Sequence, residues 1–262
     1  MEHRTSDKPP TAIAILPARY ASTRLPGKPL LAETGKPLIQ HVVERARSAK
    51  RIDRVVVATD DQRIFDTVVG FGGEAVMTGE HPNGTSRIAE AVERLNNDHE
   101  LIVNVQGDEP EIDPAVIDQL VQGLAEDAAA QMATLCSPFT QDEDPTNPNV
   151  VKVVCDQRGR ALYFSRSLVP FDRDAQLLGA KPQAAVLKHP GLYAYRRGFL
   201  LAYPSLAPTP LEQAEKLEQL RVLEHGHAIR VIPAHAPEPG IDTPEQYAAF
   251  VRRSLRLASE TG

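Results

Sequence analysis

The sequence predicts an α/β fold with a mainly parallel sheet flanked by helices and a smaller, partly antiparallel region. Through the first half of the chain, short apolar runs typical of strands alternate with segments whose apolar residues recur at helical spacing. A stretch rich in Pro, Asp and Asn at 137–149 interrupts this alternation, and several strand-like runs follow it closely. The chain of 262 residues, 42% hydrophobic and 24% charged, has ordinary globular composition and can build a sizeable core.

The first half is expected to supply the parallel strands and the helices between them. Strands are predicted at 12–16, 55–58, 101–105 and 132–136, each a short apolar run that ends at polar or turn residues. Between the first two strands, Pro37 suits the first turn of a helix with apolar residues at helical spacing (Leu38, Ile39, Val42, Val43 and Ala46). A further helix is predicted at 114–124.

The second half is expected to add short strands and two helices with clear start signals. Strand-like runs lie at 150–155, 161–165 and 184–195. The motifs TPLE at 209–212 and TPEQ at 243–246 each fit a capping box with proline at the first helical position. The last helix is predicted to pack against the body through one apolar face, formed by Tyr247, Phe250, Val251 and Leu255.

Charge and composition argue against several classes of protein. The formal net charge of −6 disfavours extended nucleic-acid binding, which requires a basic surface. No run approaches the roughly 20 apolar residues that span a bilayer, and the first ten residues lack the apolar segment of a secretory signal. Cys136 and Cys155 lie in apolar, strand-like surroundings without metal-binding spacing, which predicts buried thiols in a cytoplasmic protein, with a disulfide between them as the alternative.

The segment PARYASTRLPGKPL at 17–30 follows the first strand directly and contains three cations and no acid. Ligands of open α/β sheets bind beyond the carboxyl ends of the strands, where Arg19, Arg24 and Lys28 would lie. Small residues such as Ala18 let backbone N–H groups approach phosphate oxygens. We therefore predict a triphosphate-binding loop, with a solvated basic surface loop as the alternative. The segment is neither a Walker A loop nor a GxGxxG turn.

Two aspartates lie beside predicted secondary-structure ends, and the first is a candidate for holding a magnesium ion. Asp108 in NVQGDEP at 104–110 follows a strand, so it is expected at the same sheet edge as the basic loop. The alternative for Asp108 is a polar turn, in which aspartate is common. Asp242 directly precedes the last helix, where it could cap the helix or interact with its dipole.

The loop and several later motifs resemble those of the 3-deoxy-manno-octulosonate (Kdo) cytidylyltransferases, or CMP-Kdo synthetases. RLPGKPL at 24–30 resembles the signature loop of sugar nucleotidyltransferases. Further motifs follow in family order: ATD at 58–60, NVQGDEP at 104–110, NPNVVKVV at 147–154, ALYFSR at 161–166, KHPGLYAYR at 188–196, PLEQAEKLEQLRVL at 210–223 and IDTPEQ at 241–246. The resemblance spans roughly residues 12–255 and departs from the family pattern at Asn83, Ser86 and Pro190.

The resemblance implies transfer of CMP from CTP to Kdo, giving CMP-Kdo and pyrophosphate, with Mg²⁺ as cofactor. It implies four regions: a disordered tail at 1–11, a nucleotide-binding core at 12–136, a substrate-binding and dimerisation region at 137–227, and a return to the core with the C-terminal helix at 228–262. A cytoplasmic homodimer serving lipopolysaccharide synthesis is expected, with neither nucleic acid nor membrane as partner. Two alternatives stay open: a cytidylyltransferase for another acid sugar, and a nucleotide-binding protein without turnover.

The resemblance also implies roles for individual residues. The catalytic residues would be Arg19, Lys28 and Asp108, and the metal ligands Asp108 and Asp242. The nucleotide would be bound by Pro17, Ala18, Arg19, Arg24, Lys28, Arg87 and Gln106. The sugar would be bound by Gln106, Arg166, His189, Tyr193, Glu218 and Gln219. An arginine such as Arg166 can hold the sugar carboxylate through two charge-assisted hydrogen bonds.

Overall fold

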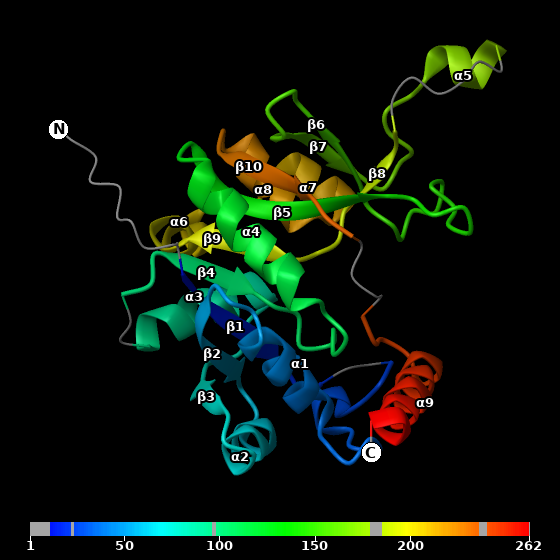
Figure 1. Cartoon of the computed structure of the whole chain (residues 1–262). Helices are drawn as coiled ribbons and strands as arrows, with labels where there is room; N and C mark the ends of the chain where they lie inside the picture. Colours follow the sequence, from blue (N-terminus) through cyan, green and yellow to red (C-terminus); the bar gives the residue numbers. More distant parts are fainter. Residues whose placement is uncertain (1–10, 22–23, 96–97, 179–184, 236–239, 262) are drawn as a thin grey trace. The chain divides into compact units, whose positions relative to one another are not determined.

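The computed structural model describes residues 11–21, 24–95, 98–178, 185–235 and 240–261 (Figure 1). Nearly all of the tail predicted at 1–11, together with Ser22 and Thr23 of the basic loop, lies outside these residues. The chain forms two compact units, one from residues 1–118 and 237–262, the other from residues 119–236. Across the described residues, no helix has the length and apolar character needed to cross a membrane.

The first unit contains a parallel sheet in the order β3-β2-β1-β4. Strand β1 (Ala12–Ala18) pairs with β2 (Ile52–Thr59) on one side and with β4 (Leu101–Asn104) on the other, and β3 (Glu74–Met77) pairs with β2. Strands β2 and β3 are added in turn on one side of β1, and the chain then crosses to the other side of β1 to form β4. The loops that follow β1 and β4 therefore leave neighbouring strands at the same edge, the switch point at which open α/β sheets bind ligands.

Helices α1 (Leu38–Arg47), α2 (Gln62–Gly70) and α3 (Gly84–Arg94) connect or follow these strands, and α4 (Pro114–Glu126) crosses into the second unit. The apolar stripe predicted for α1 is confirmed, because all five of its residues are buried. Asn83, one of the departures from the family pattern, caps α3: its Oδ1 accepts a hydrogen bond of 2.9 Å from the Ser86 backbone N–H.

The last helix, α9 (Pro244–Thr261), begins with the predicted capping box. The Thr243 N–H donates to Gln246 Oε1 at 3.0 Å, and the Gln246 N–H donates to Thr243 Oγ1 at 3.3 Å. Three residues of the predicted apolar face join a buried cluster made of Leu25, Leu38, Ile241, Tyr247, Phe250 and Val251. The prediction was wrong for Leu255, which is 50% exposed, because the helix continues beyond the surface that covers its first turns.

The second unit is built on β5 (Ala130–Pro138), which pairs antiparallel with β9 (Tyr193–Arg196) and parallel with β10 (Ala228–Pro233). Strand β8 (Leu187–Lys188) pairs antiparallel with β5 and with β6 (Lys152–Cys155), which forms a hairpin with β7 (Ala161–Ser165). The run predicted as one strand at 184–195 is thus two short strands, and residue 184 lies outside the described residues. Cys136 and Cys155 are both free thiols, as predicted.

Short helices complete the second unit: α5 (Arg173–Leu178), α6 (Arg197–Ala202), α7 (Pro210–Glu215) and α8 (Glu218–Glu224), together with a 3-10 turn at Tyr203–Ser205 (η2). The first unit has a 3-10 turn of its own at Lys28–Leu30 (η1).

The fold class predicted from the sequence, a mixed α/β protein with a mostly parallel core sheet, is confirmed. The compact units divide within α4, at 118/119, whereas the sequence places a boundary at 136/137. Strand β5 belongs to the second unit because β9 and β10 both pair with it.

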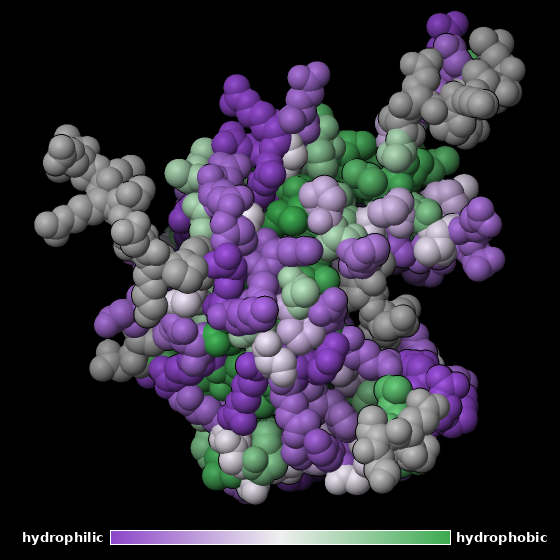
Figure 2. All heavy atoms as spheres, viewed as in Figure 1, coloured by the Kyte–Doolittle hydropathy of each residue, from purple (hydrophilic) through white to green (hydrophobic). Residues whose placement is uncertain are grey.

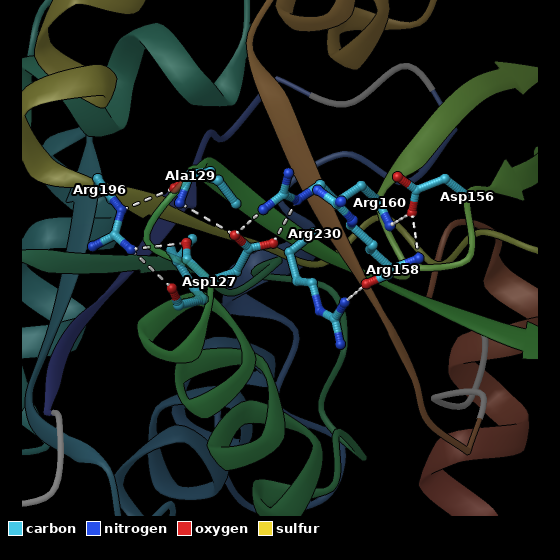
Figure 3. A network of polar contacts seen from close by, with 9 residues as sticks. Asp127, Ala129, Asp156, Arg158, Arg160, Arg196 and Arg230 are labelled. Carbon is cyan, nitrogen blue, oxygen red and sulfur yellow. Dashed lines mark hydrogen bonds and ion pairs between the residues drawn. The ribbon is translucent and has the colours of Figure 1, made fainter.

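A network of arginines ties the end of α4 to the strands of the second unit (Figure 3). Arg160 donates to both carboxylate oxygens of Asp127, at 2.8 and 2.7 Å. Arg196 donates to the backbone carbonyls of Ala130 at 2.8 Å, Leu124 at 3.0 Å and Asp127 at 3.1 Å. The Leu124 and Asp127 carbonyls lie at and just beyond the last turn of α4, where the final carbonyl groups lack helical partners, and Ala130 begins β5. Arg196 therefore acts as a side-chain cap for this helix end.

We expect Arg196→Met to lower the free energy of unfolding by about 2 kcal/mol, the size typical of hydrogen bonds to charged groups. The matched control is Arg158→Met, because Arg158 has an exposed side chain and enters the network through its backbone. The control should stay within about 0.5 kcal/mol of the wild type. Urea unfolding followed by circular dichroism measures both, and equal stability of the two variants would contradict the capping role.

Candidate active site

The basic loop closes on itself between β1 and the 3-10 turn η1. Gly27 has a φ of +67°, and its N–H donates to the Tyr20 carbonyl at 3.2 Å. A Cβ at Gly27 would lie 3.2 Å from the Tyr20 ring, so both the backbone conformation and the close approach require glycine. A second contact to the Tyr20 ring comes from Arg63 of α2, whose Cζ lies 3.3 Å from the ring centroid. The loop is thereby held where Lys28 begins its turn.

Lys28 points its ammonium group at two carboxylates from distant parts of the chain. Its Nζ donates to Asp108 Oδ2 at 2.7 Å, to the Ile241 carbonyl at 2.7 Å and to Asp242 Oδ1 at 3.2 Å. The other oxygen of Asp242 pairs with Arg24 Nη2 at 3.0 Å. The Lys28 side chain is only 13% exposed, so these contacts form in a partly dehydrated setting where charge interactions strengthen. Asp108 and Asp242 therefore converge on one cation.

The loops that carry these acids are joined by their backbones as well. The Ile241 N–H donates to the Asp108 carbonyl at 2.8 Å. A Cβ at Gly240 would lie 3.4 Å from Asp108 Oδ1, and one at Gly107 would lie 3.2 Å from the Pro17 carbonyl. Gly240 thus lets the segment before α9 approach the loop after β4, and Gly107 lets that loop approach the end of β1. The separation of the two carboxylates is thus set by backbone contacts in addition to Lys28.

Asp242 does not act as the cap of α9. Thr243 supplies the cap, while the Asp242 carboxylate faces Lys28 and Arg24. The alternative of a purely capping aspartate is therefore wrong, and the sequence signal that identifies the cap is the Thr243-to-Gln246 spacing.

The two carboxylates fit a magnesium ion better than a metal with an all-protein ligand set. Within the described residues, no three or more His, Cys, Asp or Glu side chains cluster in a way that could hold a metal. Magnesium commonly takes one or two protein carboxylates and completes its shell with water and substrate phosphates. Asp108 and Asp242, which already share a cation, could hold such an ion beside a bound triphosphate.

Glu109 differs from its neighbour Asp108 in environment. Burial raises the pKa of Glu109 to about 8, with a smaller contribution from the Asp108 charge, and its Oε2 has no hydrogen-bond partner within the described residues. The sequence gives no sign of this difference, because both acids occur in one polar motif.

The other residues predicted to bind the nucleotide take varied positions in the first unit. Pro17 and Ala18 are the last residues of β1, Arg19 is exposed, and Gln106 is partly buried after β4. Arg87 is buried on α3, where its guanidinium donates to Asp60 Oδ2 at 2.6 Å and to Thr78 Oγ1 at 2.9 Å. It thereby links residues that directly follow β2 and β3.

The residues predicted to bind the sugar lie in the second unit, apart from Gln106. Arg166 is oriented by backbone carbonyls: its Nε donates to Glu215 O at 2.7 Å and its Nη1 to Pro148 O at 3.0 Å. Glu215 also accepts from the Arg166 N–H at 2.9 Å and from Ser165 Oγ at 2.7 Å. Among the described residues, Nη2 has no hydrogen bond, so part of a fixed guanidinium plane is available to an anion.

His189 is held by Thr134 in one protonation state. Its Nε2 lies 2.9 Å from Thr134 Oγ1, and that hydroxyl donates to the Leu192 carbonyl at 2.8 Å. The hydroxyl has one proton, and the nearer of its two carbonyl partners is Leu192, so we assign that proton to the carbonyl and the ring hydrogen of His189 to Nε2. Burial lowers the pKa of His189 to about 3, so the ring is neutral near pH 7 with Nδ1 as an acceptor.

Tyr193, Glu218 and Gln219 complete the predicted sugar-binding set. The Tyr193 ring lies beside His189, with centroids 5.5 Å apart, and burial raises the pKa of Tyr193 well above its usual value. Gln219 is buried at the start of α8, and its Nε2 has no hydrogen-bond partner within the described residues. A buried amide donor of this kind is costly unless a partner arrives. Glu218 is partly buried beside it.

Sequence reasoning missed two residues that position this group. Thr134 lies inside an apolar strand, and only its pairing with the segment 189–193 gives it a role. Glu215 lies in the helical motif PLEQAEKLEQ. The one sequence signal for its contact with Arg166 is its position close before Glu218, which was predicted to bind the sugar.

The chain is similar to known cytidylyltransferases in sequence and in fold. A family model described as cytidylyltransferase matches residues 13–229. The chain is 52% identical over 236 residues to the 3-deoxy-manno-octulosonate cytidylyltransferase of Syntrophotalea carbinolica, covering 88% of this chain and 94% of the relative. It is 51% identical over 251 residues to the protein of the same name from Geobacter metallireducens, covering 93% and 98%.

A solved structure of CMP:2-keto-3-deoxy-manno-octonic acid synthetase complexed with CTP superposes with a TM-score of 0.85 at 44% identity, covering 95% of this chain and 99% of the other. The chain belongs to the cytidylyltransferase family, a class of nucleotidyltransferases. The resemblance to Kdo cytidylyltransferases predicted from the motifs is confirmed by these relatives.

The contacts of His189 generate a spectroscopic prediction. We expect its ¹⁵N NMR signals to correspond to the Nε2–H tautomer and to stay constant between pH 5 and 8, because the pKa of about 3 lies below this range. With the folded pKa below the unfolded value, this residue favours folding fully above about pH 6.5 and progressively less as the pH falls toward 3.

The control for this experiment is Thr134→Val, which removes the hydroxyl acceptor and should allow the other tautomer to be populated. A titration midpoint for His189 between pH 5 and 8 in the wild type would contradict the assignment.

Proposed function

We propose that the protein transfers CMP from CTP to 3-deoxy-D-manno-octulosonate, giving CMP-Kdo and pyrophosphate. The observation that carries the proposal is the convergence of Lys28, from the PARYASTRLPGKPL loop, with Asp108 and Asp242 at the carboxyl edge of the parallel sheet. Such a group suits a triphosphate and a divalent cation. Relatives about half identical over most of their length, which carry the Kdo cytidylyltransferase name, support this substrate pair.

The reaction joins the anomeric hydroxyl oxygen of Kdo to the α-phosphorus of CTP. The bond from that phosphorus to the oxygen bridging the β-phosphate breaks, pyrophosphate leaves, and the hydroxyl loses its proton. Reactions of this kind depend mainly on alignment and on neutralisation of charge. In our proposal Arg19, Arg24 and Lys28 neutralise the triphosphate, and Pro17, Ala18, Arg87 and Gln106 help to shape the nucleotide site.

Asp108 and Asp242 would hold Mg²⁺ as the cofactor, which when bound neutralises phosphate charge and lowers the pKa of the attacking hydroxyl. The protein's own contribution is to fix the two carboxylates. Their loops are tied by the hydrogen bond from Ile241 N to Asp108 O.

Residues of the second unit would bind the sugar acid. Arg166, held in a fixed plane by Glu215 and Pro148, can pair with its carboxylate. His189 offers an acceptor at Nδ1 and Gln219 a buried donor at Nε2, which suit the hydroxyl groups of a sugar. Tyr193 and Glu218 would complete the sugar contacts.

Two further properties belong to this proposal. A homodimer is supported by apolar side chains that the second unit exposes: Leu162 is 63%, Phe171 68% and Leu177 66% exposed. Figure 2 shows a green, apolar area around the part of the second unit where Figure 1 draws β6, β7 and β8. We also propose a cytoplasmic enzyme that activates Kdo for lipopolysaccharide synthesis, without nucleic acid or membrane as partner.

A pyrophosphate-release assay tests the proposed substrates. We expect turnover with CTP and Kdo, and turnover at least about a hundredfold lower with UTP, ATP or GTP, a difference of about 2.7 kcal/mol in transition-state binding. A panel containing sialic acid and an amino analogue of Kdo tests the alternative of another acid sugar. No turnover with any acid sugar would instead favour a binding protein that has lost catalysis.

A pair of variants separates the metal role of Asp242 from the structure of α9. Asp242→Asn should reduce turnover by at least about a hundredfold because a charged ligand is lost, while the melting temperature stays within about 1 °C. Thr243→Ala removes the cap and should cost about 1 kcal/mol of stability while turnover is largely kept. Differential scanning fluorimetry and the pyrophosphate assay measure both variants, and full activity of Asp242→Asn would exclude the metal role.

A further inference from the structure

The position that suits a divalent cation is already taken by the ammonium group of Lys28. Nζ lies 2.7 Å from an oxygen of Asp108 and 3.2 Å from an oxygen of Asp242, the same two carboxylates that fit magnesium. Asp242 is shared in addition with Arg24. An ammonium group with three donors satisfies this site well, because its third hydrogen bond goes to the Ile241 carbonyl.

The charges of the paired groups cancel. Two carboxylates, Asp108 and Asp242, face two cations, Lys28 and Arg24. A divalent cation arriving alone meets no net negative charge in this group and must displace a nearly buried ammonium from its partners. A triphosphate changes this balance, since its anionic oxygens offer Lys28 and Arg24 other partners.

We infer that Lys28 occludes the metal site until a nucleoside triphosphate draws its ammonium group away, so that metal and nucleotide bind together and not the metal first. This inference rests on the proposed function, since it uses the same two carboxylates as metal ligands. It assigns Lys28 a second task, in which it competes with the cofactor before it contacts the phosphates. Metal and nucleotide then promote each other's binding by the same factor.

The site would remain formed without the ammonium group. The hydrogen bond from Ile241 N to Asp108 O and the close packing of Gly240 against Asp108 both hold the acids near each other independently of Lys28. Removing the ammonium should therefore leave Asp108 unpaired and Asp242 paired only with Arg24, a group of net negative charge that is a better site for a free divalent cation.

Binding of Mn²⁺ in the absence of nucleotide, followed by the EPR signal of the free ion, tests this inference. We expect Lys28→Met to bind Mn²⁺ at least about tenfold more tightly than the wild type, although the variant loses its phosphate contact. Lys28→Arg keeps a cation at the site and should bind as weakly as the wild type. Adding Asp108→Asn to Lys28→Met should abolish the gain.

The matched control is Lys36→Met. Lys36 pairs with Glu44 at 2.8 Å in the same unit, so its loss changes the net charge equally without exposing Asp108 or Asp242. A gain as large in this control, or no gain in Lys28→Met, would overturn the inference. If Lys28→Met does not fold, Lys28→Gln retains a donor for the Ile241 carbonyl and is judged by the same outcomes.

The inference and the proposed function fail separately. Metal binding is measured without substrates, so a protein that did not use Kdo could still show tighter Mn²⁺ binding in Lys28→Met. A protein that made CMP-Kdo but showed no such gain would disprove only the occlusion by Lys28.

Discussion

The ion pairs between Lys28 and the two aspartates join three segments that are far apart in the sequence. The loop after β1 supplies the lysine, the loop after β4 supplies Asp108, and the segment before α9 supplies Asp242. The parallel order of β1 and β4 brings the first two together at one sheet edge. The third reaches the same place because Ile241 is packed in the apolar cluster with Leu25 and Tyr247. Charge and core packing thus support the same arrangement.

Much of the first unit could be predicted because its signals are local. Short apolar strands, the helix after Pro37 and the capping box at Thr243 follow from periodicity and capping chemistry. The sheet-edge position of Asp108 follows from the rule that parallel strands share an edge. The exposure of Leu255 could not be predicted, since helical spacing defines a face but not how far the covering surface extends.

The second unit was less predictable because its roles depend on contacts between distant segments. Thr134 fixes the tautomer of His189 across 55 residues of sequence, and Glu215 orients Arg166 across 49. Neither Thr134 nor Glu215 stands out in composition or spacing. Comparison with the family motif also gave no reason for asparagine at position 83. The structure supplies one, because the Asn83 side chain caps α3.

The discontinuity of the first unit affects the protein during its synthesis. Residues 240–251 supply the second carboxylate as well as four of the six residues in the buried cluster around Leu25, and they are synthesised after the segments that carry Lys28 and Asp108. A nascent chain can form the β1–β4 sheet, but its Lys28 and Asp108 lack their third partner until these residues emerge. The chain can therefore complete its cation site only after residues 240–251 have been synthesised.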